Sequence, residues 1–304
     1  MDPVDDAHID AFFEKFTLRQ MIIIPLVVFA VSLLILAGTT LSVGAPVKLG
    51  MEFLGGSAMT IDTEDSISSL QQAFSDYPLH SVREHGNRKL LQFEPMSQEE
   101  QMTLVNLAVE RYGAENIEIR QVGEVFGKSQ QIRALQALVI AFVLMAGVVF
   151  LIFRRIIPAI TVIFAGFADI IFATAMMNVF GLRLTFGTLA ALLMLIGYAV
   201  DTNLLLTNRV LKRRGDPMRQ IKGAMKTGLM MTSTTLAALL VLFIISTLSY
   251  HLVSGFTRID IVSEIALVLI FGLLADMMNT WMLNTGILRR YVIPTLSGRG
   301  GRRR

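Results

Sequence analysis

The sequence predicts an α-helical polytopic membrane protein with six spans and one small α+β domain between the first two. Hydrophobic residues make up 53% of the 304 residues, and charged residues only 17%. A helix needs about 20 apolar residues to cross a hydrocarbon core about 30 Å thick. Six windows meet that length, and one long polar stretch, 43–131, interrupts them. The predicted spans are 21–42, 132–153, 156–179, 185–207, 229–248 and 261–288.

The segment before the first span, 1–20, alternates phenylalanine with charged residues in DDAHIDAFFEKFTLRQ. This pattern predicts an amphipathic helix at the membrane interface. The span that follows is too long for the apolar part of a signal peptide and has no small-residue cleavage site after it. We therefore expect it to remain in the protein as a transmembrane helix.

The polar stretch 43–131 predicts a compact domain of alternating strands and helices. SAMTIDT alternates as a strand, 64–74 is expected to be helical, and HSVREHGNRKLLQFEP predicts a hairpin that turns at Gly86 and Asn87. Ser97 followed by Glu100 forms a capping box for a helix over 97–112, and NIEIRQVG ends the domain as a strand. The order β-α-β-β-α-β is that of a ferredoxin-like sandwich. Its two histidines fall on opposite faces of one predicted strand, so we expect no metal site.

Basic residues follow the membrane topology. They gather in the connections 154–155 and 208–228 and in the tail 289–304, whereas the short loops of the other side hold only Arg183 and Arg258. By the positive-inside rule, both termini are cytoplasmic and the α+β domain lies outside the cell membrane. The segment 208–228 mixes apolar and basic residues and is expected to lie on the inner leaflet as an amphipathic helix. This distribution leaves no basic face for a nucleic acid.

Three acidic residues, Asp169, Asp201 and Asp276, lie inside predicted spans. A carboxylate at the bilayer centre costs roughly 2.5–3.5 kcal/mol on insertion scales, so such a residue usually has a partner or a function. We therefore predict that these acids are proton- or ion-coupling residues, neutral in one state and ionised or ion-bound in another. The alternative is that each stays protonated and serves as an interhelical hydrogen-bond donor.

Small and polar residues accompany these acids. Asp201 shares a helix face with Gly187, Ala190, Met194 and Gly197, and this face is expected to lie against another helix. The expected supporting residues are Thr202 and Asn203 beside Asp201, Asn279 and Thr280 one turn after Asp276, and a hydroxyl run that includes Thr234. No Lys, Arg or His occupies the central part of a span, so we expect no permanent salt bridge within the chain.

Several motifs resemble those of the SecD/SecF family of protein-export membrane proteins. GMEFLGGS resembles the family's Gly-x-Asp-Phe-x-Gly-Gly signature, with Gly50 and Phe53 matching and Glu52 in place of Asp. The stretch 184–210 is similar to the fourth-span signature, including the basic residue after it, here Arg209. FADII resembles the family's HDV stretch, and MKTGLMMTSTTLAALL resembles the start of the fifth span. Length and layout match the SecF branch, and the sixth span is similar to its archaeal members.

The resemblance implies a fold related to half of an RND transporter. It implies a SecD-type membrane subunit, the Sec translocation channel and the translocating secretory polypeptide as partners, besides the lipid bilayer. Export would draw on the proton-motive force, through proton or sodium passage at Asp201 with Asp276 and Asp169. Gly55 and Gly56 are candidate hinge residues at the base of the domain, the alternative being a plain turn before the first strand.

Two other functions stay open at this point. One is a half of an RND-type proton-coupled exporter, and the other is a structural subunit of the translocation channel without ion flow. An enzyme is not expected, because the sequence has no nucleophile–base pair, phosphate-binding loop or metal-ligand cluster. The chain has no cysteine, which excludes disulfides and thiol nucleophiles, and we expect no cofactor.

Overall fold

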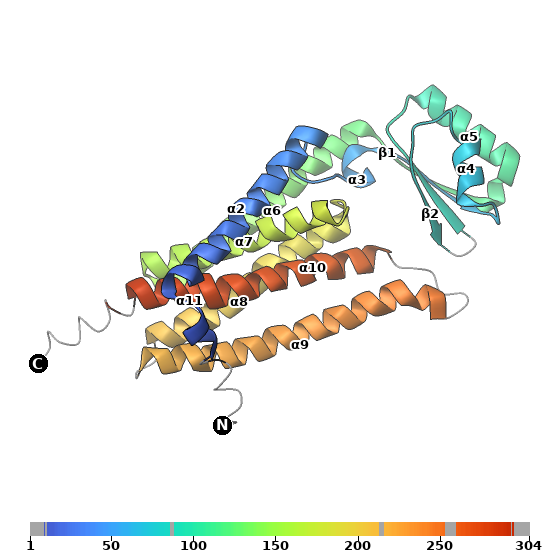
Figure 1. Ribbon diagram of the computed structural model, residues 1–304. Coiled ribbons are helices and arrows are strands. Elements are labelled where there is room, and N and C mark those ends of the chain that lie inside the picture. The colour runs from blue at the N-terminus through green and yellow to red at the C-terminus, as the bar shows by residue number, and fades with distance from the viewer. Residues whose placement is uncertain are drawn as a thin grey trace, which may run out of the picture.

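The computed structural model describes residues 9, 11–85, 88–212, 216–252, 260–292 and 294. It has two parts, a bundle of long helices and a small α/β domain at one end of that bundle (Figure 1). Within the described residues, six helices have the length and composition of membrane spans, as the sequence predicts. The spans are α2 (Leu18–Val43), α6 (Glu124–Phe153), α7 (Ile156–Val179), α8 (Phe186–Lys212), α9 (Pro217–Leu252) and a composite last helix.

The last helix is continuous but not uniform. It starts as α10 (Asp260–Met278), continues as the π-helix η2 (Asn279–Asn284) and α11 (Thr285–Ile287), and ends as a second π-helix, η3 (Leu288–Val292). A π-helical segment contains an extra residue in the turn and frequently occurs at functional sites. All six residues of η2 are buried, so this irregular segment lies inside the bundle.

The core of the bundle is formed by α7, α8 and α10. These three helices contact one another, and their buried apolar residues make one continuous cluster. Close approach is possible where α10 has a glycine, because a Cβ atom at Gly272 would overlap the side chain of Leu195 on α8. The outer helices α6 and α9 expose much of their length, with Val143, Leu151 and Ile245 among their exposed apolar residues. Such a surface fits contact with acyl chains.

The α/β domain follows a short helix, α3 (Met51–Leu54). Its elements are β1 (Gly56–Asp62), α4 (Ile67–Ala73), β2 (Leu79–His85), β3 (Arg88–Phe93), α5 (Gln98–Tyr112), a 3-10 turn η1 (Ala114–Asn116) and β4 (Ile117–Val122). The strands form one antiparallel sheet in the order β2-β3-β1-β4. The predicted succession of strands and helices is therefore present. The turn predicted at Gly86 and Asn87 lies outside the described residues.

One face of this sheet carries both helices (Figure 1). The core between them is built on the large buried side chains of Phe74, Leu91, Phe93 and Leu104. The predicted capping box starts α5: Ser97 Oγ accepts from the backbone N–H of Glu100 at 3.3 Å, and Glu100 Oε2 accepts from the backbone N–H of Ser97 at 2.9 Å. This cap fixes where α5 begins, close to the end of β3.

A strap of chain, residues 44–55, joins α2 to the domain and binds to the bundle on the way. The backbone N–H of Gly50 donates to Leu184 O at 2.8 Å, and the N–H of Leu184 donates to Lys48 O at 2.7 Å. The amide of Asn178, near the end of α7, donates to Pro46 O at 2.8 Å. The strap is therefore attached to the connection between α7 and α8.

The strap also binds α6, through the motif residue Phe53. This side chain is fully buried and packs edge-on against Phe186, at 5.3 Å between ring centroids. Its carbonyl accepts from Nε2 of Gln131 on α6 at 2.6 Å. On the same helix, Gly127 packs directly against the carbonyl of Phe53 and the N–H of Gly55. The Gly-Met-Glu-Phe motif thus forms the base on which the domain rests.

The two candidate hinge glycines have backbone conformations that favour glycine. Gly55 has φ +83° and Gly56 has φ +122°, and a Cβ atom on Gly56 would overlap the carbonyl of Phe93. This close packing favours the fixed turn that was the alternative to a hinge. A role in motion stays a prediction.

The segment 208–228 differs from its prediction. It does not form a separate helix on the membrane surface, because α8 extends through Lys212 and α9 starts at Pro217 and runs without a break into the fifth span. The reason is that Ile221, Ala224 and Met225 are buried against Trp281 and against Ile9 near the N-terminus. The apolar face that predicts an interfacial helix therefore contacts protein.

The tight contact at Gly127 gives a test of the attachment of the domain. Gly127→Ala is expected to destabilise the protein by about 1–3 kcal/mol, because the new methyl group meets backbone atoms of the strap. The readout is the Tm of the purified protein in detergent. The matched control is Gly147→Ala on the same helix, where a Cβ meets nothing within 4 Å and where helix propensity favours alanine. Equal Tm values for the two variants would contradict the described contact.

Candidate functional site

The three intramembrane acids have different surroundings. Asp169 on α7 and Asp276 on α10 are fully buried, each with 0% exposure. Asp201 on α8 is exposed on the surface of the chain. The structure therefore brings Asp169 and Asp276 into the core formed by α7, α8 and α10 and directs Asp201 away from it.

Asp276 is surrounded by neutral donors. The hydroxyl of Thr202 donates to its carboxyl group, with Oγ1 2.6 Å from Oδ2 and 2.8 Å from Oδ1. The hydroxyl of Thr280 and the Nδ2 amide of Asn203 donate to Oδ1 at 3.0 and 3.2 Å. Two of these three partners come from α8, so the carboxyl group joins α8 to α10. Hydrogen bonds of this kind compensate for the removal of a polar group from water.

Asp169 has one described side-chain partner, Asn279 on η2. The amide Nδ2 of Asn279 donates to Asp169 Oδ1 at 2.7 Å. The other two oxygens of this pair, Asp169 Oδ2 and Asn279 Oδ1, are buried and have no hydrogen-bond partner. A proton on Asp169 supplies a donor to a pair that otherwise holds two unpaired acceptors. Protonation of Asp169 would therefore satisfy this pair better than ionisation would.

Further polar side chains extend this group along α8 and η2. The amide of Asn284 donates to Asn203 Oδ1 at 2.8 Å and to Thr207 Oγ1 at 3.2 Å. We call the whole group the polar cluster. It consists of Asp169, Thr202, Asn203, Thr207, Asp276, Asn279, Thr280 and Asn284, all of them buried.

The polar cluster contains no basic residue. The sequence of α7 has no Lys, Arg or His, and neither has the stretch from Asp260 to Asn284. On α8 the basic residues begin only at Arg209. An ionised carboxyl group in the cluster therefore has no counter-charge from these three helices. A proton or a small cation that enters the cluster would neutralise it.

The position of Asp201 corrects one prediction. Of the five residues predicted to lie against another helix, Ala190, Met194, Gly197 and Asp201 are exposed, whereas Gly187 at the start of α8 packs against Ile261 and Ile265 of α10. A Cβ on Gly197 would meet nothing within 4 Å. The physical reason is that Thr202 and Asn203 bind Asp276, and successive residues differ in direction by about 100°. Turning these two side chains inward turns Asp201 outward.

The predicted supporting residues divide into two groups. Thr202, Asn203, Asn279 and Thr280 belong to the polar cluster. The hydroxyl of Thr234 instead donates to carbonyls of its own helix, at 2.8 Å from Met231 O, so its expected bond to an acid is not present. The guanidinium of Arg209 donates to Thr227 Oγ1 at 3.1 Å and links the end of α8 to α9.

Sequence reasoning did not identify Thr207 and Asn284. Each lies four residues after a cluster member, Asn203 and Thr280 respectively, and so continues the same helix face toward the end of the span. This spacing is the signal that could have found them. The motif residues Gly50, Glu52 and Phe53 lie in the strap, which includes the short helix α3, and not in the cluster.

The contact between Thr202 and Asp276 can be tested by removing one hydroxyl group. Thr202→Val keeps the shape of the side chain and is expected to destabilise the protein by about 1–3 kcal/mol, because the buried carboxyl group loses a donor. The control is Thr161→Val, a buried threonine on α7 whose hydroxyl donates to Ile157 O of its own helix at 2.8 Å. Thermal unfolding in detergent compares them. A loss at Thr202 no larger than the loss at Thr161 would refute the role given to Thr202.

Comparison with known proteins identifies the family to which the chain belongs. Residues 104–293 match the family described as protein export membrane protein SecD/SecF, C-terminal. The chain is 44% identical over 274 residues to the protein-export membrane protein SecF of Methanolacinia petrolearia, a match that covers 90% of this chain and 94% of the relative. It is 40% identical to SecF of Haloferax volcanii, covering 92% and 94%. The chain belongs to the family of SecF protein-export membrane proteins.

Solved structures of SecDF show the same fold. The crystal structure of SecDF from Thermus thermophilus, described as a translocon-associated membrane protein, aligns with a TM-score of 0.67 at 18% identity. The alignment covers 90% of this chain and 37% of that longer chain. A second SecDF structure, in a super-membrane-facing form, aligns with a TM-score of 0.56. The chain thus spans little more than a third of these structural relatives.

Proposed function

We propose that this chain is the SecF-type accessory subunit of a Sec protein-export machine and acts beside a SecD-type subunit. In this proposal the polar cluster takes up and releases a proton or a sodium ion, and this cycle assists the movement of the exported polypeptide. The observation that carries the proposal is Asp276, a fully buried carboxyl group bound only by neutral donors in a chain of this family.

The energetics favour two states for such a group. An ionised carboxyl group inside the bilayer is unfavourable without a counter-charge, whereas a neutral or ion-bound one is tolerated. Hydroxyl groups such as Thr202 and Thr280 can donate to a carboxylate and accept from a carboxylic acid, so the same side chains serve both states. Moving one charge through 100 mV supplies about 2.3 kcal/mol, which can bias a polypeptide against sliding back.

The exposed face of α8 is the proposed contact with the SecD-type subunit. It presents an acid, Asp201, within a stripe of small and apolar residues, and an acid facing lipid alone would be unfavourable. The longer SecDF chains, of which this chain matches 37%, leave room for such a second half. In this arrangement Asp201 faces the partner and Asp276 stays within the chain.

The proposed topology follows the basic residues. Both termini lie in the cytoplasm, and the α/β domain lies outside as a ferredoxin-like domain, an assignment supported by its strand order β2-β3-β1-β4. The strap then sits at the outer surface of the membrane.

The test of coupling is Asp276→Asn, which keeps size and hydrogen bonding but cannot titrate. In membranes that contain the SecD-type subunit and the Sec channel, we expect export of a reporter to fall to the rate of the unmodified protein treated with a proton or sodium uncoupler. The variant's own rate should then no longer respond to the uncoupler. Glu99→Gln, on the exposed surface of α5, is the control. Full export with an intact uncoupler response would leave a purely structural subunit as the better description.

The partner face can be tested by cross-linking, since the chain has no cysteine of its own. Gly197→Cys is expected to form a cross-link with the SecD-type subunit through a short bis-maleimide. The control is Val143→Cys on α6, which is 61% exposed. The readout is the shifted band on a gel probed for the SecD-type subunit. A cross-link from Val143→Cys but not from Gly197→Cys would place the partner elsewhere.

A further inference from the structure

The α/β domain has an open strand edge. Within the part of the chain that the structure describes, β4 pairs with β1 and with no other strand, so it forms one edge of the sheet. The outer side of an edge strand offers backbone N–H and C=O groups at regular spacing, and an extended polypeptide can pair with them. The six residues of β4 provide about 20 Å of such edge.

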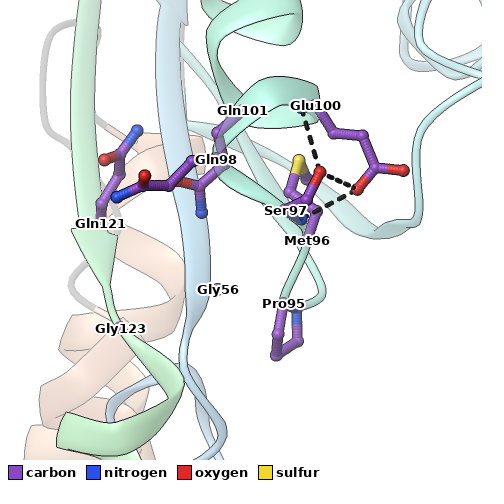
Figure 2. Close-up of a pocket in the computed structure, with 9 residues that line it drawn as sticks. All are labelled: Gly56, Pro95, Met96, Ser97, Gln98, Glu100, Gln101, Gln121 and Gly123. Atoms are coloured by element: carbon purple, nitrogen blue, oxygen red, sulfur yellow. Dashed lines mark hydrogen bonds between the residues drawn. The ribbon is translucent and has the colours of Figure 1, made fainter.

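A cleft of about 610 Å³ adjoins the end of this edge. It lies between the start of α5 and the last residues of β4 and is of the size that binding sites commonly have. Figure 2 shows Gln98 and Gln101 reaching into it from α5 and Gln121 from β4. The remaining lining residues are Gly56, Pro95, Met96, Ser97, Glu100 and Gly123.

Apart from Glu100, the side chains that line the cleft are uncharged. A primary amide carries two donors and an acceptor, so the three glutamines match the hydrogen-bonding groups of a peptide backbone whatever its side chains. Glu100 has the acidic side chain of the lining, but its carboxylate accepts from the N–H and hydroxyl of Ser97, both at 2.9 Å. These bonds lower the pKa of Glu100 and hold its carboxylate in the helix cap (Figure 2).

The edge strand and the cleft share one residue. Gln121 is the next-to-last residue of β4 and pairs with Ser57 of β1, so it belongs to both features. The end of a strand added along β4 would reach the cleft at Gln121. The cleft has no aromatic residue, and aromatic anchors are typical of stable protein interfaces. Its chemistry therefore suits a transient ligand of variable sequence better than a permanent subunit.

We propose that the α/β domain binds an extended segment of the exported polypeptide by strand addition to β4, with the glutamine-lined cleft holding the end of that segment. This inference rests on the proposed function, because it takes an unfolded exported chain as the ligand. The domain then grips the polypeptide through its backbone, a contact that any sequence can make.

The test uses the full chain in lipid nanodiscs, without channel or partner. Benzoylphenylalanine replaces Gln121, and the probe is a biotinylated peptide of alternating valine and serine, as long as β4. The control position is Met102, which is 72% exposed on α5. We expect labelling at Gln121 to exceed labelling at Met102 by roughly tenfold, the ratio given by about 1.4 kcal/mol. A twin peptide with alternate N-methylated amides cannot pair with a strand and should lose that excess.

A second measurement addresses the glutamines. The double variant Gln98→Ala and Gln121→Ala should weaken binding of the fluorescent peptide by roughly tenfold, a loss of about 1.4 kcal/mol. Gln71→Ala on the exposed side of α4 is the control and should bind as the unmodified protein does.

Three results would overturn the inference. They are equal labelling at the two positions, equal labelling by the N-methylated twin, and labelling of the SecD-type subunit in place of the secretory chain when the variant is placed in native membranes. The nanodisc assay does not depend on export. If peptide labelling fails while Asp276→Asn still shows an export defect, this inference is rejected and the proposed function stands.

Discussion

The hydrogen bonds between Asp276 and α8 determine how the bundle is arranged. Thr202 and Asn203 can reach this buried carboxyl group only if their side of α8 faces α10. That rotation of α8 fixes which of its residues are buried and which are exposed, including Asp201. In lipid there is little hydrophobic drive to choose one helix face over another, so polar contacts and close packing set the rotation. The contact of Gly272 with Leu195 then brings α8 and α10 together.

The same constraint explains the irregular last span. Asn279, Thr280 and Asn284 must bind three different neighbours, on α7, α10 and α8. A regular helix places residues at fixed angles, whereas a π-helical turn shifts the angles of those that follow. The π-helix η2 covers the range that contains these three side chains. We infer that the local departure from α-helical geometry lets one helix supply partners to both buried acids.

The sequence predicts the spans and the order of the small domain well, because length, apolar content and strand–helix alternation carry that information locally. It also identifies Asn279 and Thr280 as polar residues of the site, since they lie one turn after Asp276. Thr280 binds Asp276, whereas Asn279 binds Asp169 on α7. It does not give the rotation of α8 about its axis, because two faces of this helix are plausible packing faces. One face carries Gly187, Ala190 and Gly197, and the other carries Ala191, Thr202 and Asn203. That choice depends on α10. The continuity of α9 likewise depends on a buried neighbour, Trp281, and not on the basic and apolar pattern of 208–228.

The helices that carry the polar cluster are also those that hold the strap. On α7, Asp169 and Asn178 are nine positions apart, about 13 Å along the helix, and Asn178 binds the strap at Pro46 and Lys48. The connection from α7 to α8 holds the strap at Leu184, shortly before the helix that bears Thr202. A change of charge that moves α7 relative to α8 would therefore displace the strap at both attachments. Phe53 and Gly127 attach the strap to α6 as well. Such a shift would therefore move the strap relative to α6, at the base of the domain. A chain of contacts therefore connects the helices of the buried acids to the base of the α/β domain.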